Sequence, residues 1–160
     1  MTKKNVWLLF FILLKLSLHL WLINPVYDLH RDEYLHLDQA KHLAWGFESV
    51  PPFTSWISWL ILQLGNGVFW VKFFPALFGA LTIVVVWMAI QELKGNLFSL
   101  ILGATAITFS ALLRMNILFQ PNSFEILCWT FLFFTLIKYI DSYNNKWLWV
   151  AAITFAIAFL

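Results

Sequence analysis

Charged residues are scarce in this sequence. Only 11% of its 160 residues are Asp, Glu, Lys or Arg, whereas 62% are hydrophobic. Soluble domains are about one quarter charged and about half apolar. The composition therefore excludes a water-soluble globule, and its many apolar residues exclude an intrinsically disordered chain.

Cysteine is nearly absent, and neither sign of charge dominates. The one cysteine, Cys128, excludes an internal disulfide framework and a cysteine-rich metal cluster. The net charge of +2 is too small for a nucleic-acid-binding surface. We therefore expect membrane lipids as surroundings and no nucleic acid as a partner.

The sequence instead consists of long apolar stretches separated by short polar ones. A helix needs about 20 residues to cross a bilayer. We therefore expect one all-α integral membrane domain over 1–160, with about four full transmembrane helices and a cut fifth. The predicted spans are 5–26, 68–90, 97–113, 122–140 and 147–160.

The remaining stretch, 27–67, is predicted to form a loop that holds two interfacial helices. The first lies within 27–48, is amphipathic and ends near Gly46. The second lies between the prolines at 51–52 and the Gly-Asn-Gly sequence at 65–67. Its length of about 12 residues is too short for a crossing, so an interfacial or re-entrant helix is expected, and we take it to lie along the membrane surface.

The basic residues predict the orientation. Lys3 and Lys4 precede the first span, which favours a cytoplasmic N-terminus. The span is too long for a typical signal peptide and lacks a small-residue cleavage site, so we expect an uncleaved anchor. The predicted location is the cell (inner) membrane, multi-pass, with loop 27–67 on the non-cytoplasmic side. The predicted inner set is Lys3, Lys4, Lys94, Lys138 and Lys146, and the outer set is Arg31, Lys41, Lys72 and Arg114.

Two adjacent acids, Asp32 and Glu33, are the sharpest chemical feature of the loop. A carboxylate at the membrane surface can act as a general base toward a hydroxyl, or hold a divalent cation against a phosphate. A solvated loop charge or a helix N-cap is the alternative, and spacing alone leaves these roles open.

Histidines recur around the acids. Asp32 and His36 are four residues apart, as are Asp38 and His42, so each pair can share a helical face. His36 and His42 are therefore candidate metal ligands, although no compact HExxH or HxxxH pattern is present. Interfacial hydrogen bonding is the alternative role. The sequence requires no cofactor and is compatible with a divalent metal.

Three further charged residues lie at the predicted outer boundary. Arg114 and Lys72 can each pair with a lipid phosphate, or serve as ordinary cations that reach the headgroups. Glu125 lies near the outer end of the fourth span. An acid in a membrane segment indicates a functional or paired role, unless it simply reaches water.

The order of these features resembles the N-terminal part of the GT-C glycosyltransferases. It is more closely similar to bacterial relatives of the dolichyl-phosphate-mannose protein mannosyltransferases, including the ArnT-like and RgtA/B/C/D-like groups. The resemblance is carried, in order, by the first span, the acidic pair in DEY, HLAWGF, VPPFTSW, the Gly-x-Gly break, WVKFFPALFGALT and LLRMNILFQPNSFEILCWTF. It covers essentially the whole chain.

The resemblance implies a hexosyl- or pentosyl-type glycosyltransferase of the cell envelope. Such an enzyme transfers a sugar from a polyprenyl-phosphate-linked donor to a hydroxyl of a lipid, glycan or protein on the non-cytoplasmic side. Asp32 matches the catalytic acid of the family, and Glu33 would orient the acceptor or a metal. Lys72 stands where the family often has Arg, and Glu125 where relatives commonly have Asp. Lys72 and Arg114 would bind the donor phosphate.

An alternative of a different class remains open. The chain could be a non-enzymatic membrane scaffold, a transporter fragment or an inactive remnant whose acidic loop binds a partner. We expect the N-terminal part of a longer enzyme, because the later spans and loops of the resembled proteins lie beyond residue 160.

Overall fold

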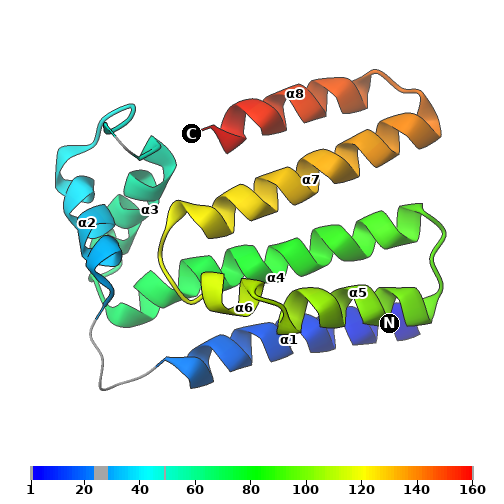
Figure 1. Cartoon of the computed structure of the whole chain (residues 1–160), viewed down its shortest axis with the longest axis horizontal. Helices are drawn as coiled ribbons and strands as arrows, with labels where there is room; N and C mark the ends of the chain where they lie inside the picture. The colour runs from blue at the N-terminus through cyan, green and yellow to red at the C-terminus, as the bar shows by residue number, and fades with distance from the viewer. Residues whose placement is uncertain (1, 24–28, 49, 160) are drawn as a thin grey trace.

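The computed structural model describes residues 2–23, 29–48 and 50–159, and in these residues it is built from helices (Figure 1). The helical elements are α1 (Lys3–Leu22), α2 (Arg31–Gln39), the short 3₁₀ helix η1 (Ala40–His42), α3 (Pro52–Gln63), α4 (Val68–Glu92), α5 (Leu97–Phe109), α6 (Leu112–Met115), α7 (Pro121–Ser142) and α8 (Lys146–Ala158). The predicted all-α membrane fold is confirmed.

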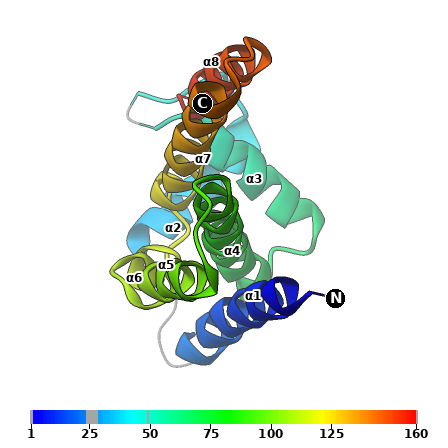
Figure 2. The same ribbon diagram turned by 90° about the vertical axis from the view of Figure 1, so that its right-hand side faces the viewer.

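Among the described residues, three helices are long and apolar enough to cross a membrane: α1, α4 and α7. Helix α4 lies at the centre, with α1 and α5 on one side and α7 on the other, and α8 packs against α7 (Figure 2). The core between α1, α4 and α5 consists of Phe11, Ile83, Trp87, Leu100 and Ala104, all buried. The predicted span 5–26 corresponds to α1, and its last residues, 24–26, lie outside the described part.

The predicted span 97–113 is wrong as a single helix. Helix α5 ends at Phe109, and Ser110 adopts an extended backbone with ψ of −178°. The Ser110 hydroxyl donates to the carbonyl of Ile107 and accepts the N–H of Leu112, which starts the short helix α6. With 13 residues each, α5 and α8 are shorter than a full crossing. The described residues therefore hold three helices of full crossing length, where four were expected.

The predicted surface segment 27–48 forms α2 and η1 in its described residues. Helix α2 begins with a capping box, in which the His30 ring accepts the N–H of Asp32 and the Glu33 carboxylate accepts the N–H of His30. Helix η1 ends at His42, before the predicted stop at Gly46.

Helix α3 matches the predicted second segment. It begins at Pro52 and ends at Gln63, and Gly65 and Asn66 follow with φ of 95° and 55°. Such left-handed backbone stops a helix, and glycine adopts it without strain. Helices α2 and α3 pack together at one end of the bundle, beside the first turns of α4 (Figure 1); we call this the α2–α3 end.

Candidate functional site

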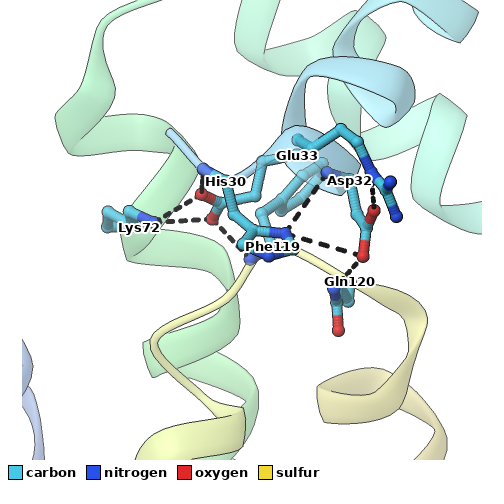
Figure 3. Close-up of polar contacts among 7 residues, drawn as sticks. His30, Asp32, Glu33, Lys72, Phe119 and Gln120 are labelled. Atoms are coloured by element: carbon cyan, nitrogen blue, oxygen red, sulfur yellow. Dashed lines mark hydrogen bonds and ion pairs between the residues drawn. The ribbon is translucent and has the colours of Figure 1, made fainter. Parts of the chain in front are cut away.

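The Glu33 carboxylate is completely buried at the α2–α3 end, and both of its oxygens accept hydrogen bonds. It accepts hydrogen bonds from Lys72 Nζ at 2.6 Å and 2.7 Å, one to each oxygen. Oε1 also accepts the N–H of Phe119 at 2.8 Å, and Oε2 accepts the N–H of His30 at 2.8 Å (Figure 3). Glu33 therefore ties α2 to α4 and to the segment that precedes α7.

This arrangement meets the requirement for keeping a charge away from water. A buried carboxylate is strongly unfavourable unless a cation and further hydrogen bonds satisfy it. Glu33 has the Lys72 ammonium and two backbone N–H groups, and it lies in the first turn of α2, where the helix dipole favours an anion. The helix-capping alternative raised by the sequence thus describes one part of the role of Glu33.

Asp32 has the opposite environment. Its side chain is 35% exposed. Oδ2 accepts a hydrogen bond from Gln120 Nε2 at 2.9 Å, and Oδ1 accepts one from Arg31 Nε at 3.3 Å. The arginine side chain is itself 92% exposed, so solvent reaches this side of the carboxylate. Asp32 is therefore an accessible carboxylate beside an inaccessible one.

The His30 ring lies close to Asp32. Its Nδ1 accepts the N–H of Asp32 at 3.3 Å. The same nitrogen lies 3.5 Å from Asp32 Oδ2, so His30 borders the carboxylate on the side of Gln120.

A half-open groove with a volume of about 690 Å³ begins beside these acids. The end of α1, the start of α4 and the segment after α6 supply apolar walls. The polar lining residues are His30, Arg31, Glu33, Lys72 and Arg114. Three predicted site residues, Glu33, Lys72 and Arg114, thus share one groove, and Asp32 lies next to its lining residues Arg31 and Glu33.

Arg114 is a cation of this groove that is available for a ligand. It is exposed on α6, and within the described residues its side chain has no hydrogen bond or ion pair. The break at Ser110 turns the chain and places α6 against α4, which brings Arg114 to the groove. Lys72 has three N–H donors, of which two point to Glu33.

Glu125 does not join this groove. It is exposed on α7 and lines a separate pocket of about 210 Å³ together with Phe53, Phe124 and Trp129. The rings of Phe53 and Phe124 stack with centroids 3.6 Å apart. The structure thus places Glu125 in aromatic surroundings, apart from Asp32 and Arg114.

The candidate metal ligands are also separated. His36 is buried, its Nδ1 lies 3.3 Å from Oε1 of Gln39, and its ring packs edge-on against Phe119. Burial lowers the pKa of His36, opposed by the hydrogen bond to Gln39 and the nearby carboxylates Asp32 and Glu33. His42 is exposed at the end of η1. In the described part of the chain, no three His, Cys, Asp or Glu side chains are grouped so as to hold a metal ion.

Sequence reasoning missed Gln120 and the backbone of Phe119. Gln120 lies 88 positions from Asp32, and Phe119 lies 86 positions from Glu33. The one local signal was the Gln-Pro step, because Pro121 at the first position of α7 marks a helix start. That signal places the start of α7 but does not reveal a contact with α2.

A comparison with known protein families shows which family the chain belongs to. The family model described as dolichyl-phosphate-mannose-protein mannosyltransferase matches residues 49–160. The chain belongs to this family. The predicted resemblance is thereby confirmed, and the chain is a multi-pass membrane protein of a GT-C-type glycosyltransferase family.

The matched region runs from α3 to the end of the chain. It includes Lys72, Arg114, Gln120 and Glu125, whereas Asp32 and Glu33 precede it. No curated protein and no solved structure matches the chain.

Proposed function

We propose that this protein transfers a sugar from a polyprenyl-phosphate-linked donor to a hydroxyl of a lipid, glycan or protein. The reaction takes place at the α2–α3 end, in the groove beside Asp32. The proposal rests on one observation: the accessible carboxylate of Asp32 lies beside a half-open groove lined by Arg31, Lys72 and Arg114. Membership of the mannosyltransferase family supports it.

Arg114 is the proposed main ligand of the donor phosphate. Its guanidinium can donate two parallel hydrogen bonds to phosphate oxygens, and no described side chain competes for it. Lys72 adds the N–H that it does not give to Glu33. The apolar walls from α1 and from the segment after α6 suit the first units of a polyprenyl chain.

Asp32 is the proposed general base. The acceptor oxygen attacks the anomeric carbon, and the bond from that carbon to the phosphate oxygen breaks. The electron pair leaves with the polyprenyl phosphate, and the hydroxyl proton passes to Asp32. Arg114 and Lys72 stabilise the charge that develops on the leaving phosphate. In this scheme Glu33 does not react; through Phe119 it orients the segment that faces Asp32.

Glu125 is proposed to bind substrate in its own pocket. Phe53, Phe124 and Trp129 offer ring faces, and the carboxylate can accept hydrogen bonds from sugar hydroxyls. We therefore assign Glu125 to the acceptor side.

The proposed orientation puts the α2–α3 end on the non-cytoplasmic side of the inner membrane, because Lys3 and Lys4 favour a cytoplasmic N-terminus. An impermeant thiol reagent added to intact cells should label Asn66→Cys in a Cys128→Ser background. Protection of this position in intact cells, with labelling after lysis, would contradict the proposed orientation.

The phosphate assignment is tested with the protein as its gene encodes it, in detergent micelles. The probe is a radiolabelled polyprenyl phosphate mannose, because mannose is the sugar in the name of the family. Arg114→Lys keeps the charge but loses the two-pronged geometry, so it should bind about 10-fold more weakly, and Arg114→Ala should bind more weakly still.

Lys41→Ala is the matched control, because Lys41 is an exposed cation on the same end that pairs with Asp38 outside the groove. It should bind the probe like the parent. Equal binding by the parent and both Arg114 variants would remove Arg114 from the phosphate site.

A further inference from the structure

We propose that Gln120 is a positioning residue whose hydrogen bond holds the Asp32 carboxylate correctly turned for catalysis. This inference rests on the proposed function, since it concerns the general base of that reaction. Two neighbouring residues of α2 meet two neighbouring residues of the segment before α7. Asp32 contacts Gln120 and Glu33 contacts Phe119, so two consecutive acids of α2 bind two consecutive residues before α7 (Figure 3).

The backbone around Gln120 is fixed on both sides. The N–H of Phe119 is bound to the buried Glu33, and the Phe119 ring is 2% exposed in a core with Leu37, Ile61 and Val71. On the other side, Pro121 starts α7. Gln120 is therefore presented to Asp32 by a rigid segment.

The chemistry of the contact is unambiguous. An ionised carboxylate can only accept hydrogen bonds, so the amide nitrogen of Gln120 must be the group that points to Asp32 Oδ2. The amide donates a hydrogen bond and carries no charge. Such a bond favours the ionised form of a carboxylate without forming a salt bridge.

The contact also selects which oxygen reacts. Oδ2 is occupied by Gln120 and lies 3.5 Å from His30 Nδ1, whereas Oδ1 faces the exposed Arg31 side chain. Oδ1 is therefore the oxygen that takes the proton from the acceptor hydroxyl. Loss of the Gln120 amide should make Asp32 easier to protonate and allow the carboxylate to rotate.

The test titrates Asp32 without any substrate. A hydrophobic carbodiimide modifies protonated carboxyl groups, and mass spectrometry of the peptide that contains Asp32 measures the extent of modification at each pH. Gln120→Met keeps the size of the side chain but has no donor, and should move the midpoint of modification upward by about 1 pH unit. Gln120→Glu places a second carboxylate against Asp32 and should move the midpoint further.

Gln63→Met is the matched control, because Gln63 is exposed on α3 and is not among the contacts of Asp32. Its midpoint should equal that of the parent. Thermal unfolding of each variant in detergent identifies any that fail to fold, and the two Gln120 variants provide independent readings. A parent-like midpoint in both folded Gln120 variants would overturn the proposal.

Kinetics separate this inference from the proposed function. In sugar transfer from polyprenyl phosphate mannose, Gln120→Met should lower kcat about 10-fold, leave KM for the donor nearly unchanged and move the acid limb of the pH–rate profile upward. Parent kinetics in a folded Gln120→Met, together with inactivity of Asp32→Asn, would refute the role of Gln120 and leave the proposed function standing. If the parent transfers no sugar but the Gln120 variants still show the upward-shifted midpoint, the proposed function is contradicted and the Asp32–Gln120 contact stands.

Discussion

Two neighbouring carboxylates on α2 have opposite surroundings, and this difference assigns them different work. Glu33 is completely buried and accepts four hydrogen bonds, two from the Lys72 ammonium and two from backbone N–H groups. Asp32 is partly exposed. The sequence could predict that this pair was chemically important, but not which acid would be buried. Burial is decided by Lys72 and Phe119, which lie 39 and 86 positions away from Glu33 along the chain.

The buried pair gives a stability prediction. Glu33→Gln or Lys72→Met alone leaves one buried charge without its partner, which should lower the free energy of unfolding by about 3–5 kcal/mol. The double variant Glu33→Gln/Lys72→Met leaves neither charge and should lose less than the sum of the single changes. Unfolding in detergent, followed by circular dichroism, measures all three.

The exposed pair Asp38–Lys41, with its atoms 2.9 Å apart, is the control for this cycle. Surface ion pairs contribute about 0–1 kcal/mol, so Asp38→Asn and Lys41→Met should each have little effect. If the buried pair proved no more costly to break than this one, Glu33 would not be the connection between α2, α4 and the segment before α7.

Helix packing depends on a close approach between α4 and the end of α6. A Cβ atom on Gly79 would lie 2.5 Å from Oδ1 of Asn116 and 3.0 Å from Cε of Lys15. The Asn116 side chain is buried, and its Nδ2 donates to the Ser123 hydroxyl. Gly79 therefore allows α6, and with it Arg114, to sit directly against α4.

The same contact region includes two polar residues of α1. Lys15 and His19 are buried against other helices. The His19 Nδ1 donates to the carbonyl of Lys15, which can only accept, at 2.7 Å. Within the described residues, Lys15 Nζ and His19 Nε2 have no hydrogen-bond partner.

Gly79→Ala should therefore destabilise the protein and weaken binding of the donor. We expect a loss of about 1–3 kcal/mol in the free energy of unfolding, because the buried Asn116 amide cannot move without breaking its bond to Ser123. Binding of polyprenyl phosphate mannose should weaken as well, since Asn116 follows α6 and α6 carries Arg114. Detergent unfolding and probe binding measure the two effects.

Gly103→Ala is the matched glycine control. Its Cβ would meet Cδ1 of Ile90 at 2.4 Å, the flexible tip of a side chain that can turn away. It should cost less stability than Gly79→Ala and leave binding of the probe unchanged. Equal effects of the two changes would mean that the contact between α4 and Asn116 does not position α6.

The helices themselves were predictable to different extents. Apolar length located α1, α4 and α7, and the Pro-Pro and Gly-Asn-Gly sequences located both ends of α3. The break at Ser110 was not predictable, because serine inside an apolar run is compatible with a continuous helix. The Ser110 hydroxyl can bond to its own helix or start a new one, and tertiary packing decides between them.

Across the protein, the two ends of the bundle carry different charged groups. Arg31, Lys41 and Lys72 belong to elements at the α2–α3 end. At the opposite end, Lys138 of α7 pairs with Glu92 at the end of α4 at 2.8 Å, and it lies over the ring of Trp147 at 5.3 Å. The prediction that Arg31, Lys41 and Lys72 lie on one side of the membrane depends on the length of α3. A helix too short to cross the membrane returns the chain to the end from which it came.

The groove could be anticipated only in part. The sequence and the family resemblance drew attention to Asp32, Lys72 and Arg114, which lie on α2, α4 and α6. Their approach depends on three helices that meet, and Gln120 enters the site through a contact that local patterns do not contain. Glu125 was grouped with them by its predicted depth, yet the direction of its side chain places it in another pocket.

The most direct test of the proposed reaction is the turnover of Asp32→Asn. In the protein as its gene encodes it, this change keeps the shape of the side chain and removes the base. Transfer of mannose from polyprenyl phosphate mannose should fall by a factor on the order of 10²–10⁴. Binding of the donor and thermal unfolding should stay close to the parent, because Asp32 lies beside the phosphate groove and is partly exposed. Turnover near the parent rate in a folded, donor-binding Asp32→Asn protein would contradict the account.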